Sequence, residues 1–415
     1  MSTFDNTPVV VKPSATDISL DSVQRFFLWL MMASGWIVVI EPAPYEYLFL
    51  VTLALMLPSG LKIHAATVPM VLFLLFYNIG GGFSVLPVTG QPDTKQFIIV
   101  SIYMAVTAIF IANVVADDTM KRIAVIKNGY IIAAVIASII GLIGYFDIGG
   151  TAATWAPIQR AQGTFKDPNV MSTFIIAPAI FLIQDFFLGR HRWPIFSAIA
   201  LLIIIAGLFF AFSRGAWVVA VASGIMLVGL MFVLTPSPRL RSRIVFLCLL
   251  GIAGLVGLLF VALSFESVRD LFLIRANFLN AYDSGETGRF GNQLRSLPML
   301  LELPNGFGPL QFGVIFGQAP HNVYVNAFAS YGWLGGFSYM LLILATIAIG
   351  FKTVFTRTPW QAFAVAVWSV LFFTILQGVQ IDTDHWRHFY LLLGLMWGLY
   401  AATVRYTRSL DQQSK

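Results

Sequence analysis

Apolar residues in this chain fall into long runs that are separated by short charged or turn-forming segments. The clearest pair lies between Arg192 and Arg239, where Arg214 is the only ionisable residue. Arg214 divides this stretch into the apolar runs 193–213 and 215–238. About 20 helical residues cross the hydrocarbon core of a bilayer, so each run predicts one membrane span. Arg214 is therefore expected at the turn between two spans.

The same pattern continues along the chain and predicts an all-α, polytopic integral membrane protein with about twelve transmembrane helices. We expect a polar tail over 1–24, a membrane domain over 25–405 and a second tail over 406–415. The predicted spans are roughly 24–40, 45–61, 65–83, 96–116, 126–146, 169–188, 194–213, 215–234, 244–264, 333–355, 360–380 and 386–404.

Composition agrees with this class. Hydrophobic residues make up 58% of the 415 positions and charged residues only 11%, against about a quarter in soluble domains. The net charge of +6 is spread over short loops, so it does not indicate nucleic-acid binding. Cys248 is the only cysteine, which excludes an intrachain disulfide. Residues 1–24 lack an apolar core and a small-residue cleavage site, so the first span is expected to act as an uncleaved signal anchor.

Loop charges predict the orientation. With the N-terminus inside, 16 of the 25 basic residues but only 7 of the 19 acidic residues fall on the inner side. The positive-inside rule therefore predicts a multi-pass protein with both termini in the cytoplasm. Arg214, the loop 147–168, the turn 381–387 and the long segment 265–331 are then outside.

The outer segment 265–331, between the ninth and tenth spans, is the longest connection and is expected to be functional. A turn at 283–288 separates two helical stretches and is followed by a Gly-rich run at 304–308. The second helix is expected over 289–303. The first is predicted to lie on the membrane surface, because apolar residues fall at helical spacing: Val268, Leu271, Phe272, Phe278 and Leu279.

Basic residues on the outer side are candidate anion ligands. Neither apolar run beside Arg214 contains Asp or Glu, so its counter-ion comes from elsewhere in the fold, from lipid or from a substrate. The alternative is an arginine that reaches toward lipid headgroups. Arg289 and Arg295 are six residues apart and point to different sides of a helix, so at most one is expected in a shared site. Either could instead be a solvated charge. Arg160, in the outer loop 147–168, completes the candidate substrate-binding arginines.

His321 opens the run PHNVY at 320–324, just before the tenth span. A neutral imidazole near pH 7 accepts a proton from a hydroxyl group, so His321 is a candidate general base and Asn322 a candidate substrate ligand. A capping or interfacial histidine is the alternative interpretation.

Two other polar segments are less specific. The turn 382–388 carries Asp382, Asp384 and two histidines three residues apart, which fits either a weak metal site or a charged cap on the twelfth span. The run 164–169 (TFKDPN) resembles a helix start and could also reach a ligand. The chain has no P-loop, HExxH or GxSxG motif, which argues against soluble-type nucleotide chemistry.

The order of these motifs is more specific than any one of them. TFKDPN at 164–169 precedes FSRGAW at 212–217, TGR at 287–289 and NGFG at 305–308, and PHNVY at 320–324 runs on to YGWLG at 331–335. In this order and topology the chain resembles the bacterial O-antigen ligase and polysaccharide polymerase superfamily. The resemblance is strongest over 160–350.

That resemblance implies a glycosyltransferase of the bacterial inner membrane, with about twelve spans and a periplasmic catalytic segment. Such enzymes transfer a glycan from undecaprenyl diphosphate to an acceptor, either lipid A–core (ligase) or another lipid-linked glycan (polymerase). Arg214 matches the arginine of the family's Ser-Arg-Gly motif, Arg289 the arginine opening its outer helix, and His321 the histidine of its His-Asn motif. Many relatives carry a glutamate where this chain has Ser330-Tyr331, so a role for that carboxylate is in doubt.

These two lines of reasoning predict one mechanism. Arg214 and Arg289 would bind the diphosphate leaving group without a metal or cofactor, because guanidinium groups bind phosphate oxygens through paired hydrogen bonds. His321 would accept or orient the acceptor proton on the opposite side of the anomeric carbon, so inversion is expected. The apolar spans would form a groove for the polyprenyl tail among the membrane lipids.

Two other classes stay open: a transporter or flippase of polysaccharides or lipid-linked glycans, and a non-catalytic scaffold. A transporter would show ionisable residues in mid-span and often an internal repeat, whereas the spans here are nearly free of charge and no repeat is seen. A scaffold would not need Arg214 and His321. The sequence leaves open ligase or polymerase, the sugars, and whether Arg160, Arg295 or Asp384 contributes to the site.

Overall fold

The fold is all-α, as predicted. In a computed structural model, residues 19–276, 285 and 288–413 are described, and these contain helices and no strands. The α-helices are α1 Leu20–Ala33, α2 Pro44–Met56, α3 Val68–Val85, α4 Thr94–Asp117, α5 Thr119–Tyr145, α6 Ala152–Trp155, α7 Pro168–Phe174, α8 Ile176–Leu188, α9 Pro194–Phe210, α10 Arg214–Leu234, α11 Pro238–Leu263, α12 Glu266–Ala276, α13 Arg289–Glu302, α14 Gln311–Phe316, α15 Val323–Phe355, α16 Gln361–Gln377 and α17 Arg387–Gln413. Four 3₁₀ turns are η1 Ser34–Trp36, η2 Leu57–Ser59, η3 Ala65–Thr67 and η4 Leu86–Val88.

Every predicted span contains a helix, but the helices differ in length. Seven segments of the described chain are long and apolar enough to cross a membrane. Two further apolar helices, α9 and α16, are shorter. The seven are Ala65–Val88, Thr94–Asp117, Thr119–Tyr145, Pro168–Leu188, Arg214–Leu234, Pro238–Leu263 and Val323–Phe355.

Several predicted boundaries were wrong; α5, for example, begins at Thr119, seven residues before the predicted 126. α1 ends at Ala33, not at residue 40, because a 3₁₀ turn over Ser34–Trp36 replaces the last helical turns. α15 begins at Val323, ten residues before the predicted tenth span. α17 continues to Gln413, through most of the predicted C-terminal tail. α17 continues as a polar helix beyond its apolar part, so apolarity alone did not reveal where it ends. The added residues of α15, 323–332, are mostly apolar, but Asn326, Ser330 and Gly332 interrupt them.

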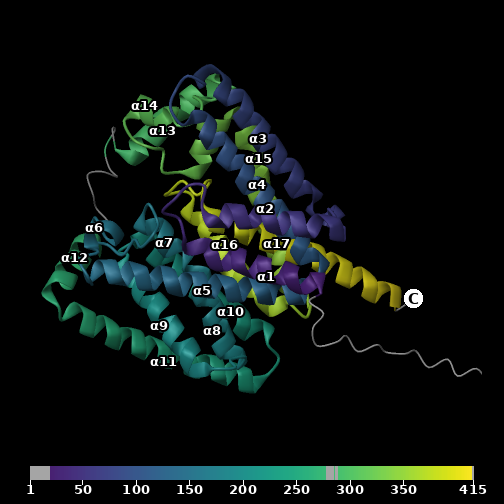
Figure 1. Ribbon diagram of the computed structural model, residues 1–415, viewed down its shortest axis with the longest axis vertical. Helices are drawn as coiled ribbons and strands as arrows, with labels where there is room; N and C mark the ends of the chain where they lie inside the picture. Colours follow the sequence, from purple (N-terminus) through teal and green to yellow (C-terminus); the bar gives the residue numbers. More distant parts are fainter. Residues whose placement is uncertain (1–18, 277–284, 286–287, 414–415) are drawn as a thin grey trace, which may run out of the picture.

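Close helix packing at small residues builds the centre of the molecule. α17 packs on α4, where a Cβ on Gly394 would lie 2.6 Å from the Ala108 carbonyl oxygen and one on Gly398 would lie 2.5 Å from that of Ala112. Small residues at this four-residue spacing let two helix backbones approach closely, as in membrane helix pairs generally. α3 packs against α15 in the same way, and Figure 1 shows α3, α4 and α15 side by side.

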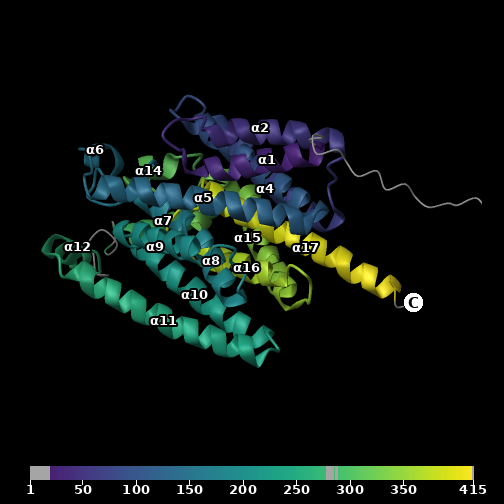
Figure 2. The same ribbon diagram turned by 60° about the horizontal axis from the view of Figure 1, so that its bottom comes forward.

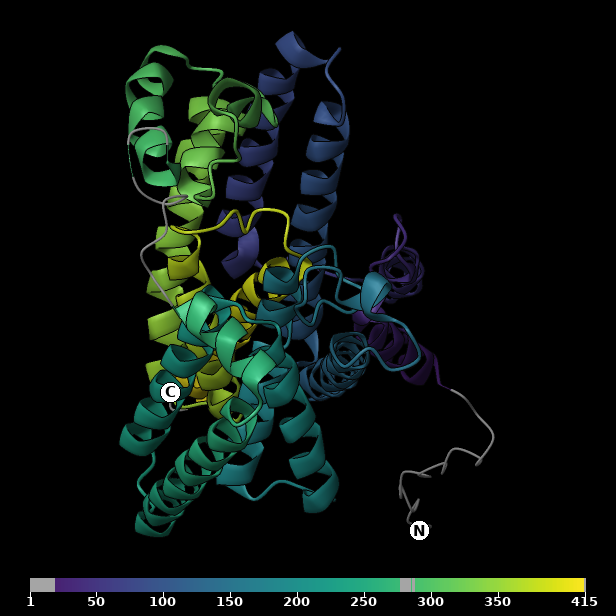
Figure 3. The ribbon, with the colours of Figure 1, turned by 90° about the vertical axis from the view of Figure 1, so that its left-hand side faces the viewer.

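The helices run between two ends of the molecule. At one end Asp21, near the start of α1, pairs with Arg122 near the start of α5 at 3.2 Å, and Arg405 of α17 hydrogen-bonds the Ala116 carbonyl of α4. The opposite end carries α6, α12, α13 and α14 (Figure 1), and Figure 3 views the molecule from that end. The starts of α1 and α5 and the end of α17 therefore lie on one side, opposite the helices of the predicted outer segment.

α11 is the outermost helix. Of its 26 residues, all of which are described, only Ile244 is buried. Figure 2 shows α11 along the edge of the molecule. Its apolar side chains fit contact with lipid, because a helix that is hydrophobic all round is stable only in an apolar surrounding.

The outer segment contains the two predicted helices. α12 covers Glu266–Ala276 and α13 covers Arg289–Glu302, close to the predicted 289–303. Phe278, Leu279 and most of the turn at 283–288 lie outside the described residues. The Gly-rich run 304–308 folds back onto α15.

That contact is at a kink in α15. Gly332 has φ 64° and ψ −170°, and Trp333 donates its N–H to the Pro304 carbonyl at 2.8 Å. Phe307 and Gly308 both donate to the Ala329 carbonyl, at 2.8 and 3.0 Å. The run 304–308 thus satisfies backbone groups at the kink, which gives this motif a structural role.

Candidate functional site

Arg214 is the first residue of α10, at the predicted turn between two apolar helices. Ser213 caps the helix, since its hydroxyl accepts the Ala216 N–H at 3.4 Å. Phe212 turns the chain with φ 46°. Arg214 itself is half-buried. Gly215 lies against α16, where an added Cβ would lie 3.1 Å from Nε2 of Gln377.

Arg289 opens α13 and reaches the turn that follows α16. Its Nη1 donates to the Gln380 carbonyl at 3.1 Å, and its guanidinium lies over the Phe290 ring at 4.7 Å. Four and seven residues further along α13, Gln293 and Ser296 are buried on the same face as Arg289. α13 therefore directs Arg289 inward.

Arg295 lies on another side of α13. It is exposed, its Nη1 lies 3.4 Å from the Asn292 side-chain oxygen, and its guanidinium is 5.8 Å from the Phe316 ring. The structure thus places Arg289 and Arg295 in different surroundings, as their spacing indicates. Arg289 hydrogen-bonds the turn after α16, whereas Arg295 lies beside Asn292 and Phe316.

His321 is held through its backbone. Its N–H donates to Oδ2 of Asp382 at 3.0 Å, and the next N–H, that of Asn322, donates to Oδ1 at 2.9 Å. His321 has φ 46°, a conformation that costs a non-glycine residue free energy unless neighbouring contacts fix it. The two hydrogen bonds to Asp382 supply such contacts. The imidazole of His321 is half-buried.

Asn322 joins the start of α15 to α13. Its side-chain oxygen caps α15 by accepting the N–H groups of Tyr324 and Val325 at 3.0 and 3.2 Å. Its side-chain nitrogen lies 3.3 Å from Oε1 of Gln293, whose own Nε2 donates to the Pro320 carbonyl at 2.8 Å. Gln293 is 8% exposed. The same face of α13 therefore carries Arg289 and holds the backbone around His321.

Residues 377–384, here called the 377–384 turn, support all three candidate residues. Gln377 contacts Gly215, next to Arg214; Gln380 binds Arg289; and Asp382 binds His321. The Gln380 N–H donates to the Gln377 carbonyl at 2.8 Å, and the ends of such a turn lie within about 7 Å. One short segment thus lies against Arg289, His321 and the neighbour of Arg214, although Arg214 and His321 are 107 positions apart in the sequence.

Charge in this turn affects its pKa values. Burial and the nearby charge of Asp384 raise the pKa of Asp382 from 3.8 to about 7. Asp384 is 2% exposed. Its Oδ2 accepts a hydrogen bond from the Asn326 side chain at 3.0 Å and lies 3.1 Å from Nδ1 of His385. Burial alone would lower the pKa of His385, but the carboxylate of Asp384 outweighs this effect and the pKa is raised.

The carboxylates of the turn therefore have protein partners. Asp382 does not cap α17, as the charged-cap interpretation expected, because it binds two amides of the segment before α15 instead. Among the described residues, no group of three or more His, Cys, Asp or Glu side chains is arranged to hold a metal ion.

Arg160 anchors the outer loop 147–168. It is 6% exposed, its Nε donates to the Ala211 carbonyl at 2.7 Å, and one Nη donates to the Asn169 side chain at 2.8 Å. These bonds tie the loop to the α9–α10 turn and to the start of α7. The substrate-binding role of Arg160 stays a prediction.

The run 164–169 starts a helix, as predicted. Asp167 caps α7, and its carboxylate accepts the Asn169 N–H at 2.6 Å. Thr164 hydrogen-bonds the Trp36 carbonyl, and Lys166 pairs with Glu41 at 2.6 Å. This run therefore also fastens the outer loop to the segment before α2.

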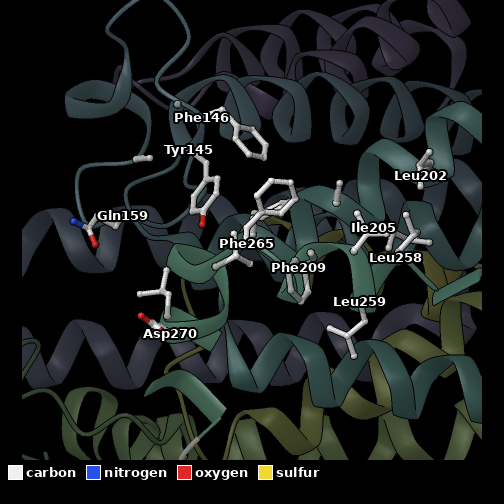
Figure 4. A pocket seen from close by; sticks show the side chains of 18 of the residues that line it. Tyr145, Phe146, Gln159, Leu202, Ile205, Phe209, Leu258, Leu259, Phe265 and Asp270 are labelled. Carbon is white, nitrogen blue, oxygen red and sulfur yellow. The ribbon is translucent and has the colours of Figure 1, made fainter. Parts of the chain in front are cut away.

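An apolar cavity lies beside the α9–α10 turn (Figure 4). Its volume is about 1100 Å³, and α5, α9, α11 and α12 contribute to its walls. Gln159 and Asp270 lie toward one end, and hydrocarbon side chains such as Leu258 line the rest. Phe209, in its wall, stacks on Trp217 with ring centroids 5.9 Å apart, on the helix that begins at Arg214.

Sequence reasoning missed Asp382 as the support of His321, and it missed Gln293 altogether. Neither contact has a local signal, because Asp382 is 61 residues from His321 and Gln293 is 27 residues from Pro320. The one available hint was the helical spacing of Arg289 and Gln293.

Comparison with known proteins gives one family match. A search of curated proteins finds no significant match to the chain. Residues 199–340 match the family model described as O-antigen ligase. The matched region includes Arg214, Arg289 and His321. The match thus supports placing the chain in the O-antigen ligase and polymerase superfamily.

Proposed function

We propose that this protein transfers a glycan from undecaprenyl diphosphate to an acceptor hydroxyl at the periplasmic face of the bacterial inner membrane. The observation that carries the proposal is the shared 377–384 turn, which contacts Arg289, His321 and the neighbour of Arg214. Such a transfer requires groups that bind the diphosphate and a group that accepts the proton of the acceptor hydroxyl. Arginines can do the first and a histidine the second.

Arg214 and Arg289 bind the diphosphate in this proposal. As the bond between the sugar C1 and the diphosphate oxygen breaks, negative charge develops on the leaving group. Guanidinium groups stabilise this charge through charge-assisted hydrogen bonds, in place of a metal ion. The position of Arg214 at the first turn of α10 adds the positive end of the helix dipole.

His321 acts on the acceptor. Its imidazole accepts the proton of the acceptor hydroxyl as that oxygen forms a new bond to C1, while undecaprenyl diphosphate leaves from the opposite face. Direct displacement of this kind inverts the configuration at C1. The backbone N–H groups of residues 321 and 322 donate to Asp382, and these two hydrogen bonds support the role by fixing the backbone from which the imidazole extends.

The polyprenyl tail occupies the apolar cavity in this proposal. The cavity is of suitable size for several isoprene units, and it adjoins the α9–α10 turn that presents Arg214. Its polar residues Gln159 and Asp270 lie toward one end, and the hydrocarbon side chains that line the rest would contact the tail (Figure 4).

A transfer assay with the purified protein tests the proposal. The full chain, in lipid nanodiscs, would be mixed with an undecaprenyl-diphosphate-linked glycan and either lipid A–core or a second lipid-linked unit. We expect a longer glycan or a glycan-bearing lipid A–core, with inverted configuration at the new linkage by NMR. Vesicles that translocate the donor without forming a new linkage would instead identify a transporter.

An experiment in cells would identify the acceptor. A deletion strain that keeps surface polymer unattached to lipid A would identify a ligase, and a strain that carries only single repeat units would identify a polymerase. Neither outcome affects the roles of Arg214, Arg289 and His321, because both reactions displace the same leaving group.

A further inference from the structure

A second cavity is lined by residues that directly follow the segment supporting His321. Its volume is about 730 Å³, and its walls come from α1, the segment before α2, α4, α5, the run 165–174 and the start of α17. His385 to His388 form one wall, and they directly follow the 377–384 turn. We call it the Arg387 cavity.

The ionic groups of the Arg387 cavity balance one another. Arg387 pairs with Glu46, and Lys166 pairs with Glu41 at 2.6 Å. All four residues line the cavity. Because each cation already faces a carboxylate, the cavity has no excess positive charge to attract a diphosphate. A neutral ligand fits this balance better than an anion.

Several polar atoms in the cavity wall lack a partner among the described residues. They are the hydroxyl of Tyr103, Nε and Nη1 of Arg387, and Nε2 of His388. His388 is 3% exposed. A buried polar group without a hydrogen bond costs about 1–3 kcal/mol, so several of them around one cavity point to a ligand that supplies the missing bonds.

The remaining lining combines aromatic rings with aliphatic side chains such as Met104 and Leu391. Tyr45, Tyr103, Phe165 and Trp386 line the cavity together with the polar groups above. Hydroxyl groups of a saccharide can satisfy the unpartnered donors and acceptors, and the apolar faces of sugar rings pack on aromatic rings. A lipid tail would leave the polar atoms unsatisfied.

We propose that the Arg387 cavity binds a neutral saccharide, namely the sugar portion of the acceptor. This inference rests on the proposed transfer reaction, and it separates the two substrates by charge. The anionic donor goes to Arg214 and Arg289, while the neutral acceptor sugar enters beside Trp386. The continuous chain from Asp382 to His388 then places the acceptor near the residue that activates it.

The substitution Tyr103→Phe tests this assignment with little risk to the fold, because it removes only a hydroxyl that has no partner among the described residues. Tyr390→Phe is the matched control. The Tyr390 hydroxyl is also buried without a partner in the described chain, and Tyr390 lies on α17 but does not line the cavity. Thermal unfolding would verify that both variants fold like the parent.

Binding would be measured on the full chain in detergent by saturation-transfer NMR, with a panel of neutral oligosaccharides and inorganic pyrophosphate as the anionic probe. We expect an oligosaccharide to bind, about three- to tenfold more weakly to Tyr103→Phe and unchanged for Tyr390→Phe, the effect of one lost hydrogen bond. Pyrophosphate binding should respond to Arg214→Lys and not to Tyr103→Phe.

Two results would overturn the inference: no oligosaccharide in the panel binds at millimolar concentration, or the two tyrosine variants bind equally well. Failure of the proposed function would look different. In that case oligosaccharide binding would depend on Tyr103 while the transfer assay gave no product. Conversely, transfer with an acceptor KM that is unchanged in Tyr103→Phe would retain the function and reject this cavity as the acceptor site.

Discussion

Asp382 holds the backbone of His321, although 61 residues separate them. The two carboxylate oxygens accept the N–H groups of His321 and Asn322 at 3.0 and 2.9 Å. Each carboxylate oxygen thus accepts one amide N–H, and the two hydrogen bonds together fix the left-handed backbone conformation of His321. The position of the imidazole therefore depends on a turn between the last two long helices.

Asp382→Asn should impair this support in a way that depends on pH. An asparagine has one acceptor oxygen, so one of the two amides loses its partner, and we expect turnover to fall about tenfold or more. The wild-type pKa of about 7 predicts that activity rises as the pH passes through 7, because the ionised carboxylate accepts both bonds. The variant should lack this rise, as pH–rate profiles of both proteins would show.

The contribution of Asp382 to stability should fall as the pH rises, whereas activity should increase. A pKa raised from 3.8 to about 7 in the folded chain means that the contribution of Asp382 to stability is fully present below pH 3.8 and is lost as the pH rises through 7. Unfolding temperatures of the wild type relative to Asp382→Asn should therefore decline between pH 5 and 8. A constant difference over this range would contradict the raised pKa.

Arg214→Lys should lower transfer sharply at normal protein levels. Lysine keeps the charge but lacks the planar pair of donors that matches a phosphate group, and about 10- to 100-fold loss of activity is expected from the lost hydrogen bonds. Arg295→Lys is the control, because Arg295 is exposed on another side of α13. If Arg214→Lys transfers as well as Arg295→Lys, then Arg214 does not bind the diphosphate through paired bonds.

Much of the fold could be predicted from the apolar pattern, because membrane helices are set by local apolarity and length. The start of α7 at Pro168 and that of α10 at Arg214 had local signals in Asp167 and Ser213. The early end of α1 at Ala33 coincides with Ser34 and Gly35, a stop signal that the apolar run 36–40 masked.

The candidate site was predicted less completely. Arg214, Arg289 and His321 could be named from motifs and charge, and helical spacing separated Arg289 from Arg295. Asp382 and Gln293 could not, because their contacts arise only when the α16–α17 turn and α13 pack around the start of α15. Side chains that position others over long sequence distances leave no periodic or local pattern.

Gly332→Ala should destabilise the kink of α15. The combination of φ 64° and ψ −170° is accessible almost only to glycine, and an added Cβ would lie 2.5 Å from the Pro304 carbonyl oxygen. We expect a loss of about 1–3 kcal/mol, measured as a lower midpoint of thermal unfolding. Gly82→Ala in α3 is the control, because no atom lies within 4 Å of its added Cβ and its backbone is helical. Equal midpoints for the two variants would show that the kink is not required.

Reporter fusions should show which end of the molecule faces the cytoplasm. The excess of basic residues on one side predicts cytoplasmic termini and a periplasmic segment 265–331. A phosphatase fused after Lys415 should be inactive, and one inserted at Gly285 should be active. The reverse result would place Arg214, Arg289 and His321 in the cytoplasm and would rule out a periplasmic reaction.

His321→Ala should separate catalysis from binding. A general base contributes about 10²–10⁴-fold, so turnover should fall by that order while the donor still binds, because alanine leaves both arginines in place. Arg289→Ala should instead weaken donor binding. Measuring donor affinity beside turnover on the purified protein distinguishes the two. If His321→Ala abolished donor binding and left turnover at saturating donor unchanged, the histidine would belong with the phosphate ligands. Alanine is preferable to glutamine here, because a glutamine side chain could still orient the acceptor hydroxyl and hide the loss of a base.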